Sequence, residues 1–292
     1  MIENTAATIP MHQVSVTPGE RVAPASMLDL DFSEQTDVGK ARDRNEDAHG
    51  HVAPANPAQA RSHGWLFVLA DGVGGHERGE VASRLAVDCL LKGFRESRAG
   101  EPHTTLLPRL AEQANLRVYE AGRAAAPGGA RMATTLVACA LRHDRAVIAH
   151  VGDSRCYLVR RGRATQLTRD HTVANEHLRM GLISAGESSQ SSNRHLLLRS
   201  LGNDLFVSVD VNQTQVVPGD VLLQCCDGLH GAVEAADMAR IVTQNKDLRE
   251  AARQLVALAN ERDGSDNISV QVVRIKGVER VGMYRGRPYK LR

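Results

Sequence analysis

The stretch WLFVLADGVGGH (residues 65–76) decides the fold, because an apolar run stops abruptly at a carboxylate followed by glycines. Residues 65–70 are apolar and bounded by polar or glycine-rich sequence, which predicts a short, fully buried strand. Asp71 then stands at the strand end, and the glycines after it let the backbone approach an ion or a phosphate closely. An Asp-Gly pair after a strand is by itself most often a simple turn, so the rest of the chain must decide.

Length and composition are those of an ordinary globular protein. The chain has 292 residues, 42% of them hydrophobic and 24% charged, which favours one large domain with tails. A net charge of +2 and a pI near 8.3 give no strong field, so we expect no nucleic-acid or membrane binding. The five cysteines lack CxxC spacing and lie in apolar segments, which predicts reduced core thiols rather than disulfides or a zinc site.

The sequence also predicts a location and a division into segments. No apolar run approaches the roughly 18 to 20 residues that span a bilayer, and the first residues do not resemble a signal peptide. We therefore expect a cytoplasmic protein, and we expect a monomer. Residues 1–28 predict a flexible N-terminal extension, residues 29–276 the folded domain, and residues 277–292 a basic tail that is loose or becomes ordered on contact.

Apolar periodicity predicts a mixture of strands and helices. Residues 77–98 and 104–126 have leucine and valine at helical spacing, which predicts two long amphipathic helices. Residues 51–62 predict a connector rich in proline and alanine, and residues 186–193 a mobile, serine-rich loop. Further strands are predicted over residues 28–36, 132–141, 145–153, 156–162, 207–216, 220–228 and 264–275, and further helices over residues 173–180, 235–244 and 248–262.

Carboxylates recur where the predicted strands begin or end. Asp227-Gly228 follows an apolar run just as Asp71-Gly72 does. Each acid alone is most simply a turn residue, but the whole set favours a site for a hard divalent cation, because Mg²⁺ and Mn²⁺ prefer carboxylate and water oxygens. The acids that share this context are Glu46, Asp47, Asp71, Asp153, Asp227 and Asp266.

Seven short motifs follow one another along the chain: RDRNED (42–47), ADGVGGH (70–76), ATTL (133–136), VGDSR (151–155), LTRDH (167–171), CDGL (226–229) and GSDN (264–267). Together they resemble the PP2C-type (PPM) metal-dependent serine/threonine protein phosphatases in their bacterial form. Seven collinear motifs are far more specific than any one of them. The resemblance implies an α+β fold, an α/β/β/α sandwich in which two antiparallel sheets lie between pairs of helices.

The resemblance also implies how the central acids bind metal. Asp71 is expected to bridge two metal ions, and the carbonyl of Gly72 to be a ligand of one of them. Asp227 and Asp266 are expected to complete the protein ligands of the other ion. The implied cofactors are two Mn²⁺ or Mg²⁺ ions.

Four more residues receive a role from the resemblance. Glu46 and Asp47 are expected to act on the Gly72 side, directly or through coordinated water. Asp153 resembles the acid that holds a third and weaker metal ion in bacterial members. Arg42 matches the arginine that grips the substrate phosphate, a task that suits its planar fork of donors.

The implied mechanism is direct attack by water. Two ions roughly 3.5 to 4 Å apart lower the pKa of a bridging water and align it for attack on phosphorus, so no phospho-enzyme is needed. The proton donor for the leaving oxygen stays open, because Val73 stands where eukaryotic relatives have a histidine. His76 is a candidate acid or a structural residue at the following helix, and a metal-bound water could serve instead.

The implied activity is hydrolysis of phosphoserine and phosphothreonine in phosphorylated proteins. This activity would reverse the phosphorylation carried out by a bacterial serine/threonine kinase. Two alternatives stay open. A non-catalytic scaffold that binds phosphoproteins would lack at least one metal acid, and another two-metal phosphohydrolase would act on small phosphoesters or nucleic acid. Outside the acids, His171 is expected to anchor the loop after it rather than to be a ligand. His230 either touches the cleft or caps a turn, and we favour the turn.

Overall fold

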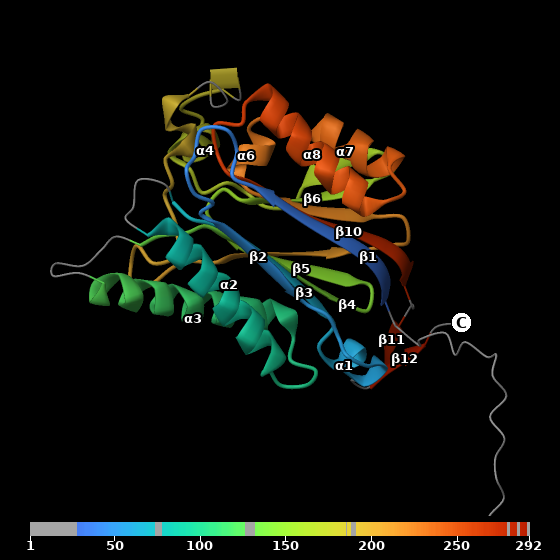
Figure 1. The fold of residues 1–292 in the computed structure, drawn as a ribbon. Coiled ribbons are helices and arrows are strands. Elements are labelled where there is room, and N and C mark those ends of the chain that lie inside the picture. Colours follow the sequence, from blue (N-terminus) through green and yellow to red (C-terminus); the bar gives the residue numbers. More distant parts are fainter. Residues whose placement is uncertain are drawn as a thin grey trace, which may run out of the picture.

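Two antiparallel sheets packed face to face form the centre of the protein, and helices cover their outer faces (Figure 1). This α/β/β/α arrangement confirms the predicted fold class. The computed structural model describes residues 28–73, 78–125, 132–184, 186–187, 191–278, 281–284 and 287–290.

Each of the two sheets has five strands in the part of the chain that the structure describes. The first sheet has the order β1 (Leu28–Asp37), β10 (Ile268–Val278), β9 (Val221–Cys225), β6 (Arg155–Arg160) and β7 (Arg163–Gln166). The second has the order β2 (Asp47–Val52), β3 (Trp65–Asp71), β4 (Leu136–Arg142), β5 (Arg145–Val151) and β8 (Asp210–Gln215).

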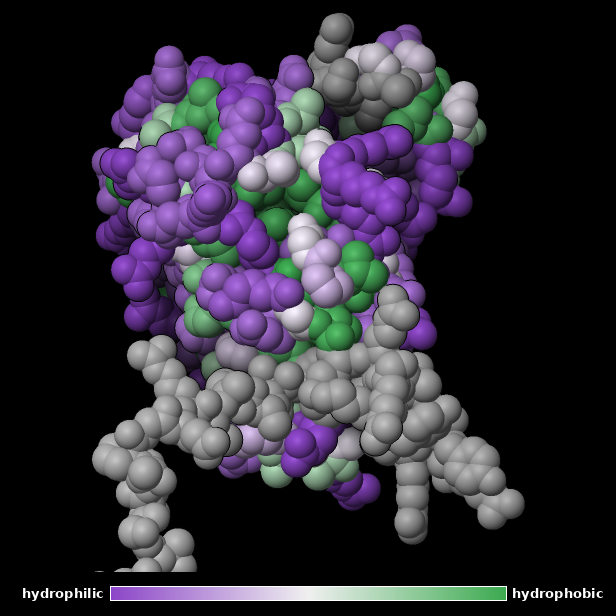
Figure 2. Space-filling model, turned by 90° about the vertical axis from the view of Figure 1, so that its right-hand side faces the viewer, coloured by the Kyte–Doolittle hydropathy of each residue, from purple (hydrophilic) through white to green (hydrophobic). Residues whose placement is uncertain are grey.

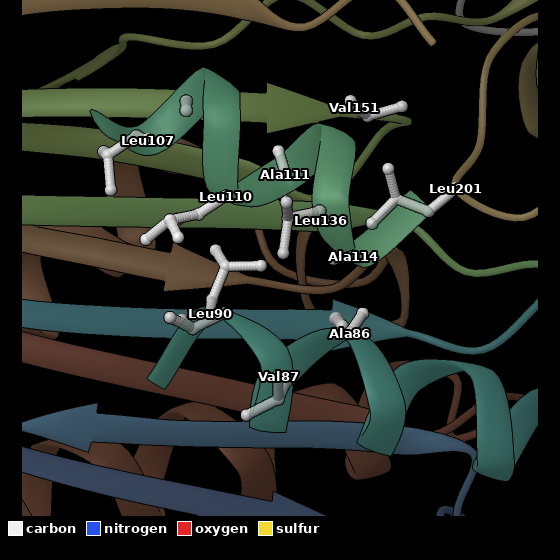
Figure 3. Close-up of a cluster of buried hydrophobic side chains, with 14 of the residues drawn as sticks. Ala86, Val87, Leu90, Leu107, Leu110, Ala111, Ala114, Leu136, Val151 and Leu201 are labelled. Carbon is white, nitrogen blue, oxygen red and sulfur yellow. The ribbon is translucent and has the colours of Figure 1, made fainter. Parts of the chain in front are cut away.

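Two pairs of helices close the sandwich from outside. The helices α2 (Gly79–Arg95) and α3 (His103–Ala124) pack on the second sheet, and Figure 3 shows Leu90 and Leu110 from these helices meeting Leu136 of β4. Each fully buried leucine contributes roughly 1.5–3 kcal/mol to folding. The helices α7 (Ala235–Gln244) and α8 (Leu248–Arg262) cover the first sheet in the same way.

The β3 strand is buried on both faces, as its apolar sequence predicts. Its residues Leu66, Val68 and Ala70 pack under the helix layer, whereas Phe67 and Leu69 pack between the two sheets. Side chains alternate along a strand, so the next residue of the second series, Asp71, belongs to the face between the sheets. The apolar inner layer therefore ends in a carboxylate.

The predicted connector over residues 51–62 is wrong, because this segment contains the end of β2 and the short helix α1 (Pro57–Ser62). The sequence does carry the signal for α1. Asn56 accepts a hydrogen bond from the Gln59 N–H at 2.9 Å, and Pro57 occupies the first helical position. The β2 strand is polar and shows no alternation, and it forms because β3 supplies its hydrogen-bond partners.

Opposite ends of the sandwich carry different short elements (Figure 1). The helices α4 (Val173–Arg179) and α6 (Asp227–His230) and the 3₁₀ helix η1 (Ser192–His195) gather at the end to which β3 leads. At the other end, β11 (Val281–Tyr284) and β12 (Arg287–Lys290) form a two-stranded hairpin in the segment expected to be a tail.

The surface at the hairpin end is mostly hydrophilic, with hydrophobic residues in small groups (Figure 2). Among the described residues, no helix combines the length and the apolar character needed to cross a membrane. The expected N-terminal extension over residues 1–28 lies outside the described residues, apart from Leu28, which begins β1.

Candidate metal centre

Two neighbouring strands place two carboxylates side by side. Asp71 ends β3, and its partner across the sheet is Asp47, the first residue of β2. Directly paired residues of an antiparallel sheet present their side chains on the same face. Donor atoms of Asp47, Asp71 and the buried Cys226 all lie within 4.8 Å of one another, so the two acids meet near the end of β9 in the opposite sheet.

The backbone of Asp71 is fixed by two threonines of the ATTL motif. The Asp71 N–H donates to the Thr135 hydroxyl at 2.9 Å, and its carbonyl accepts from the Thr135 N–H at 2.8 Å. The Thr134 hydroxyl donates to the same carbonyl at 2.8 Å. These three bonds hold the carboxylate at the strand end, a role that sequence reasoning did not assign to either threonine.

Gly72 lies where no larger residue fits. Its N–H donates to the Glu46 carbonyl at 3.1 Å, and a Cβ atom on it would lie 2.5 Å from the backbone of Gly79. Such contacts do not occur for real side chains, so the approach of α2 to the end of β3 requires glycine here. The metal ligation expected of its carbonyl stays a prediction.

The carboxylate of Asp47 is buried and uncompensated. Neither of its oxygens has a partner with hydrogen-bond geometry in the described parts of the chain. Burial raises its pKa to about 7, and the charges of Asp227 and Asp266 act in the same direction. The nearby side chains of Ser269 and Cys226 offset this only in part. A buried carboxylate without partners costs several kcal/mol unless a cation compensates it. The residues therefore fit a divalent ion, which these two oxygens would coordinate.

Cys226 is not a ligand in this arrangement. Its Sγ accepts from the Ser269 N–H at 3.0 Å and lies 3.3 Å from the Asn267 carbonyl, to which it donates. Burial raises the pKa of the thiol well above its usual range, which favours the protonated form that donates to the Asn267 carbonyl. Hard oxygen donors alone remain, as Mn²⁺ and Mg²⁺ prefer.

Asp227 differs from Asp71 in having a histidine side chain that donates a hydrogen bond to its carboxylate. It opens α6, and His195 of η1 donates from Nδ1 to its Oδ2 at 3.3 Å. Burial opposes the ionisation of Asp227, but this hydrogen bond and His230 outweigh it and lower the pKa. For Asp71, burial and the charges of Asp47 and Asp227 raise the pKa well above its ordinary value.

Asp266 and Arg42 meet at the exposed side of the cluster. The Arg42 guanidinium donates to Oδ2 of Asp266 at 2.8 Å. The arginine loop is held by Asn267, whose amide donates to the carbonyls of Val38 and Arg44 at 2.9 Å each. Arg42 is thus fixed at the edge of the carboxylate cluster, where an incoming phosphate could take the place of Asp266.

Asp153 forms another wall of the same site. It is 6% exposed, and burial together with Asp227 raises its pKa to about 8. His230 donates from Nε2 to its carbonyl at 3.0 Å, so this histidine holds the Asp153 turn rather than capping a turn of its own. Both residues line a cavity of about 600 Å³ that α4 and η1 help to enclose.

Glu46 lies on the other side of Gly72. Its carboxylate packs against Gly79 at the start of α2, and its pKa is raised by burial and by Glu80. Its direct or water-mediated contribution to a metal site stays a prediction. His76, the candidate acid, lies outside the described residues.

The structure thus brings five of the predicted acids into one cluster, in which neighbouring carboxylates raise the pKa of Asp47, Asp71 and Asp153. The acids come from both sheets and from the loops between elements. Sequence reasoning missed the supporting residues Thr134, Thr135, His195 and Asn267, because they act through backbone contacts or from a loop without periodicity.

Comparisons with known proteins identify the family of the chain. The family described as Protein phosphatase 2C matches residues 39–269. The chain is 36% identical over 258 residues to "Serine/threonine phosphatase stp" of Listeria innocua, which covers 87% of this chain and 97% of the relative.

Solved structures show the same similarity. The serine/threonine phosphatase Stp1 from Staphylococcus aureus is 30% identical, with a TM-score of 0.77 over 89% of this chain and all of its own. The catalytic domain of the serine/threonine protein phosphatase PstP, solved with two manganese ions, is 30% identical, with a TM-score of 0.72 over 85% of this chain and 98% of its own. The chain described here belongs to the metal-dependent protein phosphatase 2C family.

Proposed function

We propose that the protein hydrolyses phosphoserine and phosphothreonine in phosphorylated proteins. The observation that carries the proposal is the uncompensated carboxylate of Asp47 beside Asp71, which fits a bound divalent cation. The names of the similar proteins, and the two manganese ions in the PstP catalytic domain, support the same activity. We further propose that a bacterial serine/threonine kinase supplies the phosphorylated substrates.

The acids would hold two Mn²⁺ or Mg²⁺ ions between the sheets, with Asp71 serving both and Asp227 and Asp266 serving one. Asp153 would hold a third ion. When bound, the ions supply an activated water and neutralise the charge of the phosphoryl group. Thr134 and Thr135 keep the Asp71 backbone in place, so its carboxylate needs no rearrangement during the reaction.

Arg42 would bind the phosphate itself. Its guanidinium is partly exposed and already reaches the edge of the cluster, where it bonds to Asp266. Binding of a phosphate dianion would exchange this contact for a two-pronged one to phosphate oxygens. The residue that protonates the leaving oxygen stays open, since His76 is outside the described residues.

The division into segments is also a proposal. Residues 29–276 would form the catalytic domain, which agrees with the family match over residues 39–269. Residues 1–28 and 277–292 would lie outside it. The cytoplasmic location and the monomeric state stay predictions.

Hydrolysis of a phosphothreonine peptide tests the activity. The full-length protein is assayed with Mn²⁺, with EDTA, as Asp71→Asn and as Asp220→Asn. Asp220 is a matched control, because it is a buried carboxylate paired with Arg160 outside the cluster. We expect turnover only with Mn²⁺, its loss in Asp71→Asn and its retention in Asp220→Asn.

Two results would contradict the proposal. Equal rates with Mn²⁺ and with EDTA would exclude a metal mechanism. Absence of turnover under every condition, with metal bound and phosphopeptide retained, would favour the non-catalytic scaffold.

A further inference from the structure

His171 holds the turn between β5 and β6 by two hydrogen bonds to one residue. Its backbone N–H donates to the Gly152 carbonyl at 3.0 Å, and its Nδ1 accepts from the Gly152 N–H at 3.1 Å. His171 is 5% exposed and Gly152 is buried, so water has little access to either bond. Both polar backbone groups of Gly152 therefore depend on His171.

The turn itself is tied to the metal cluster. Gly152 has a φ of +100°, and a Cβ atom there would lie 2.7 Å from Cγ2 of Thr135. The Thr135 hydroxyl also lies 2.7 Å from the hydroxyl of Ser154 and accepts from Asp71. Through Thr135, the position of Gly152 is thus coupled to Ser154, on the other side of Asp153, and to Asp71 at the end of β3.

The contact with Gly152 fixes the tautomer of His171. Burial lowers the pKa of this histidine to about 4, so its ring is neutral near pH 7. Since Nδ1 accepts a hydrogen bond, Nε2 carries the proton. Nε2 lies 3.3 Å from Oδ2 of Asp210. The two atoms attract each other electrostatically, but their geometry is not that of a hydrogen bond. The Asp210 carboxylate therefore favours the tautomer that leaves Nδ1 free for Gly152.

A metal ion is a less suitable explanation for this cluster. His150, His171 and Asp210 do place donor atoms within 4.8 Å of one another. However, Nε2 of His171 has no lone pair in the tautomer that binds Gly152. The Asp210 carboxylate already accepts from Arg169 at 3.0 Å and from Arg199 at 2.9 Å, and these two cations would repel a metal ion.

His150 has a packing role beside His171. The two rings stack with centroids 4.8 Å apart. Nε2 of His150 lies 2.9 Å from the Arg169 carbonyl and 3.1 Å from the Arg169 N–H, in the segment that leads to His171. The stack therefore supports the orientation of the His171 ring without touching Gly152.

We propose that His171, oriented by Asp210, is a positioning residue that places the Asp153 carboxylate at the metal cluster through Gly152. His230 holds the carbonyl of Asp153, while His171 holds the residue before it. The consequence for metal binding rests on the proposed function. The consequence for the Gly152 turn does not.

The test compares His171→Leu with His171→Asn and His103→Leu in the full-length protein. Leucine removes the acceptor for the Gly152 N–H, whereas the Asn side-chain oxygen can take the place of Nδ1. His103 is the matched control, because it is also 5% exposed but donates to the His63 carbonyl, beside α1 at the other end of the sandwich. Hydrogen exchange of the Gly152 amide is measured by NMR, and the affinity of the weakest Mn²⁺ site by calorimetry.

We expect His171→Leu to speed Gly152 exchange by about tenfold or more and to weaken the weakest Mn²⁺ site by about tenfold, since a buried donor loses its partner. His171→Asn should keep both quantities within about threefold of the wild type, and His103→Leu should change neither. Unchanged Gly152 exchange in His171→Leu would overturn the proposal. So would an equal increase in His103→Leu. An inactive wild-type protein would instead count against the proposed function, because the exchange result does not depend on turnover.

Discussion

The ends of β3 and β9 carry the same Asp-Gly sequence, one in each sheet, yet their carboxylates have opposite electrostatic surroundings. At Asp71, burial and neighbouring acids raise the pKa well above its usual range. At Asp227, the contact with His195 and the proximity of His230 outweigh burial and lower the pKa. The strand pattern thus decides where a carboxylate lies, whereas side chains from distant loops decide its charge.

This difference indicates where a cation is needed most. The Asp71 side of the cluster includes the unpartnered Asp47 carboxylate, and the described side chains supply no positive partner for it. The Asp227 side already has a partner in His195. A bound metal ion would therefore stabilise the Asp71 side more, and it would compete with His195 for Asp227.

The largest expected effect is on catalytic activity, which Asp71→Asn should lower more than Asp227→Asn does. Asp71→Asn should lower kcat/KM for a phosphothreonine peptide by on the order of a thousandfold, because it would serve both ions. Asp227→Asn should lower it by on the order of a hundredfold, because it would serve one. Steady-state kinetics at saturating Mn²⁺ measures both. A larger loss in Asp227→Asn would reverse the assignment of the bridging residue.

The metal-free protein should lose stability as the pH rises from about 6.5 to 8. The pKa of Asp47 is raised to about 7 and that of Asp153 to about 8, both from an ordinary value of 3.8. In this window the folded state binds more protons than the unfolded state, so the free energy of unfolding falls as pH increases. The window starts at pH 6.5, the ordinary pKa of histidine. The buried His171 and His230 have pKa values lowered to about 4, so below pH 6.5 they make the free energy of unfolding rise with pH and oppose the effect of the acids.

Scanning calorimetry in EDTA measures this change. We expect the Tm to be lower by about 5 °C at pH 8 than at pH 6.5, since each kcal/mol shifts the Tm of a domain of this size by roughly 2–4 °C. Saturating Mn²⁺ should remove most of the difference. A metal-free protein that is equally stable at both pH values would show that the acids are compensated in another way.

Thr135→Val tests the backbone support of Asp71. Valine has nearly the same shape but leaves the Asp71 N–H without its acceptor, which should cost about 1–3 kcal/mol of stability. Mn²⁺ affinity should fall by about tenfold, as for other residues that orient metal ligands. Chemical denaturation and calorimetry check the two values. Loss of stability with intact Mn²⁺ affinity would mean that Asp71 does not need this support.

The smallest effect concerns the Tm of the metal-free protein. Replacing Asp227 by Asn should lower the Tm, whereas replacing Asp71 by Asn should not. Asp227→Asn should lower the Tm in EDTA by about 1–3 °C, because the hydrogen bond from the half-exposed His195 loses its charged acceptor. Asp71→Asn should leave the Tm unchanged or raise it, because it removes a buried acid without a positive partner. Thermal unfolding in EDTA at pH 8 checks this, and equal destabilisation by both variants would remove the contrast.

The sequence predicts the places of the acids well, because local patterns determine them. An apolar run followed by Asp-Gly is sufficient to find the ends of β3 and β9, and alternation along β3 assigns Asp71 to the face between the sheets. The long helices α2 and α3 are found from their 3.6-residue periodicity for the same reason.

Features that depend on contacts between distant segments are not predictable in this way. The polar β2 strand is a strand only because β3 lies beside it, and Thr135 acts on Asp71 from another strand. His195 comes from a segment without periodicity, so nothing local indicates its contact with Asp227. The helix α1 is a different case, since the Asn56-Pro57 pair is a recognisable start signal that the connector interpretation overlooked.

Anomalous diffraction at the manganese absorption edge, from crystals grown with Mn²⁺, tests the central claim most directly. The proposal that Asp71 serves both ions predicts two strong peaks between the sheets, both within bonding distance of the Asp71 carboxylate, and their loss in crystals of Asp71→Asn. Manganese peaks that avoid Asp71, for example at His150, His171 and Asp210, would contradict the assignment of the metal centre to the strand-end carboxylates.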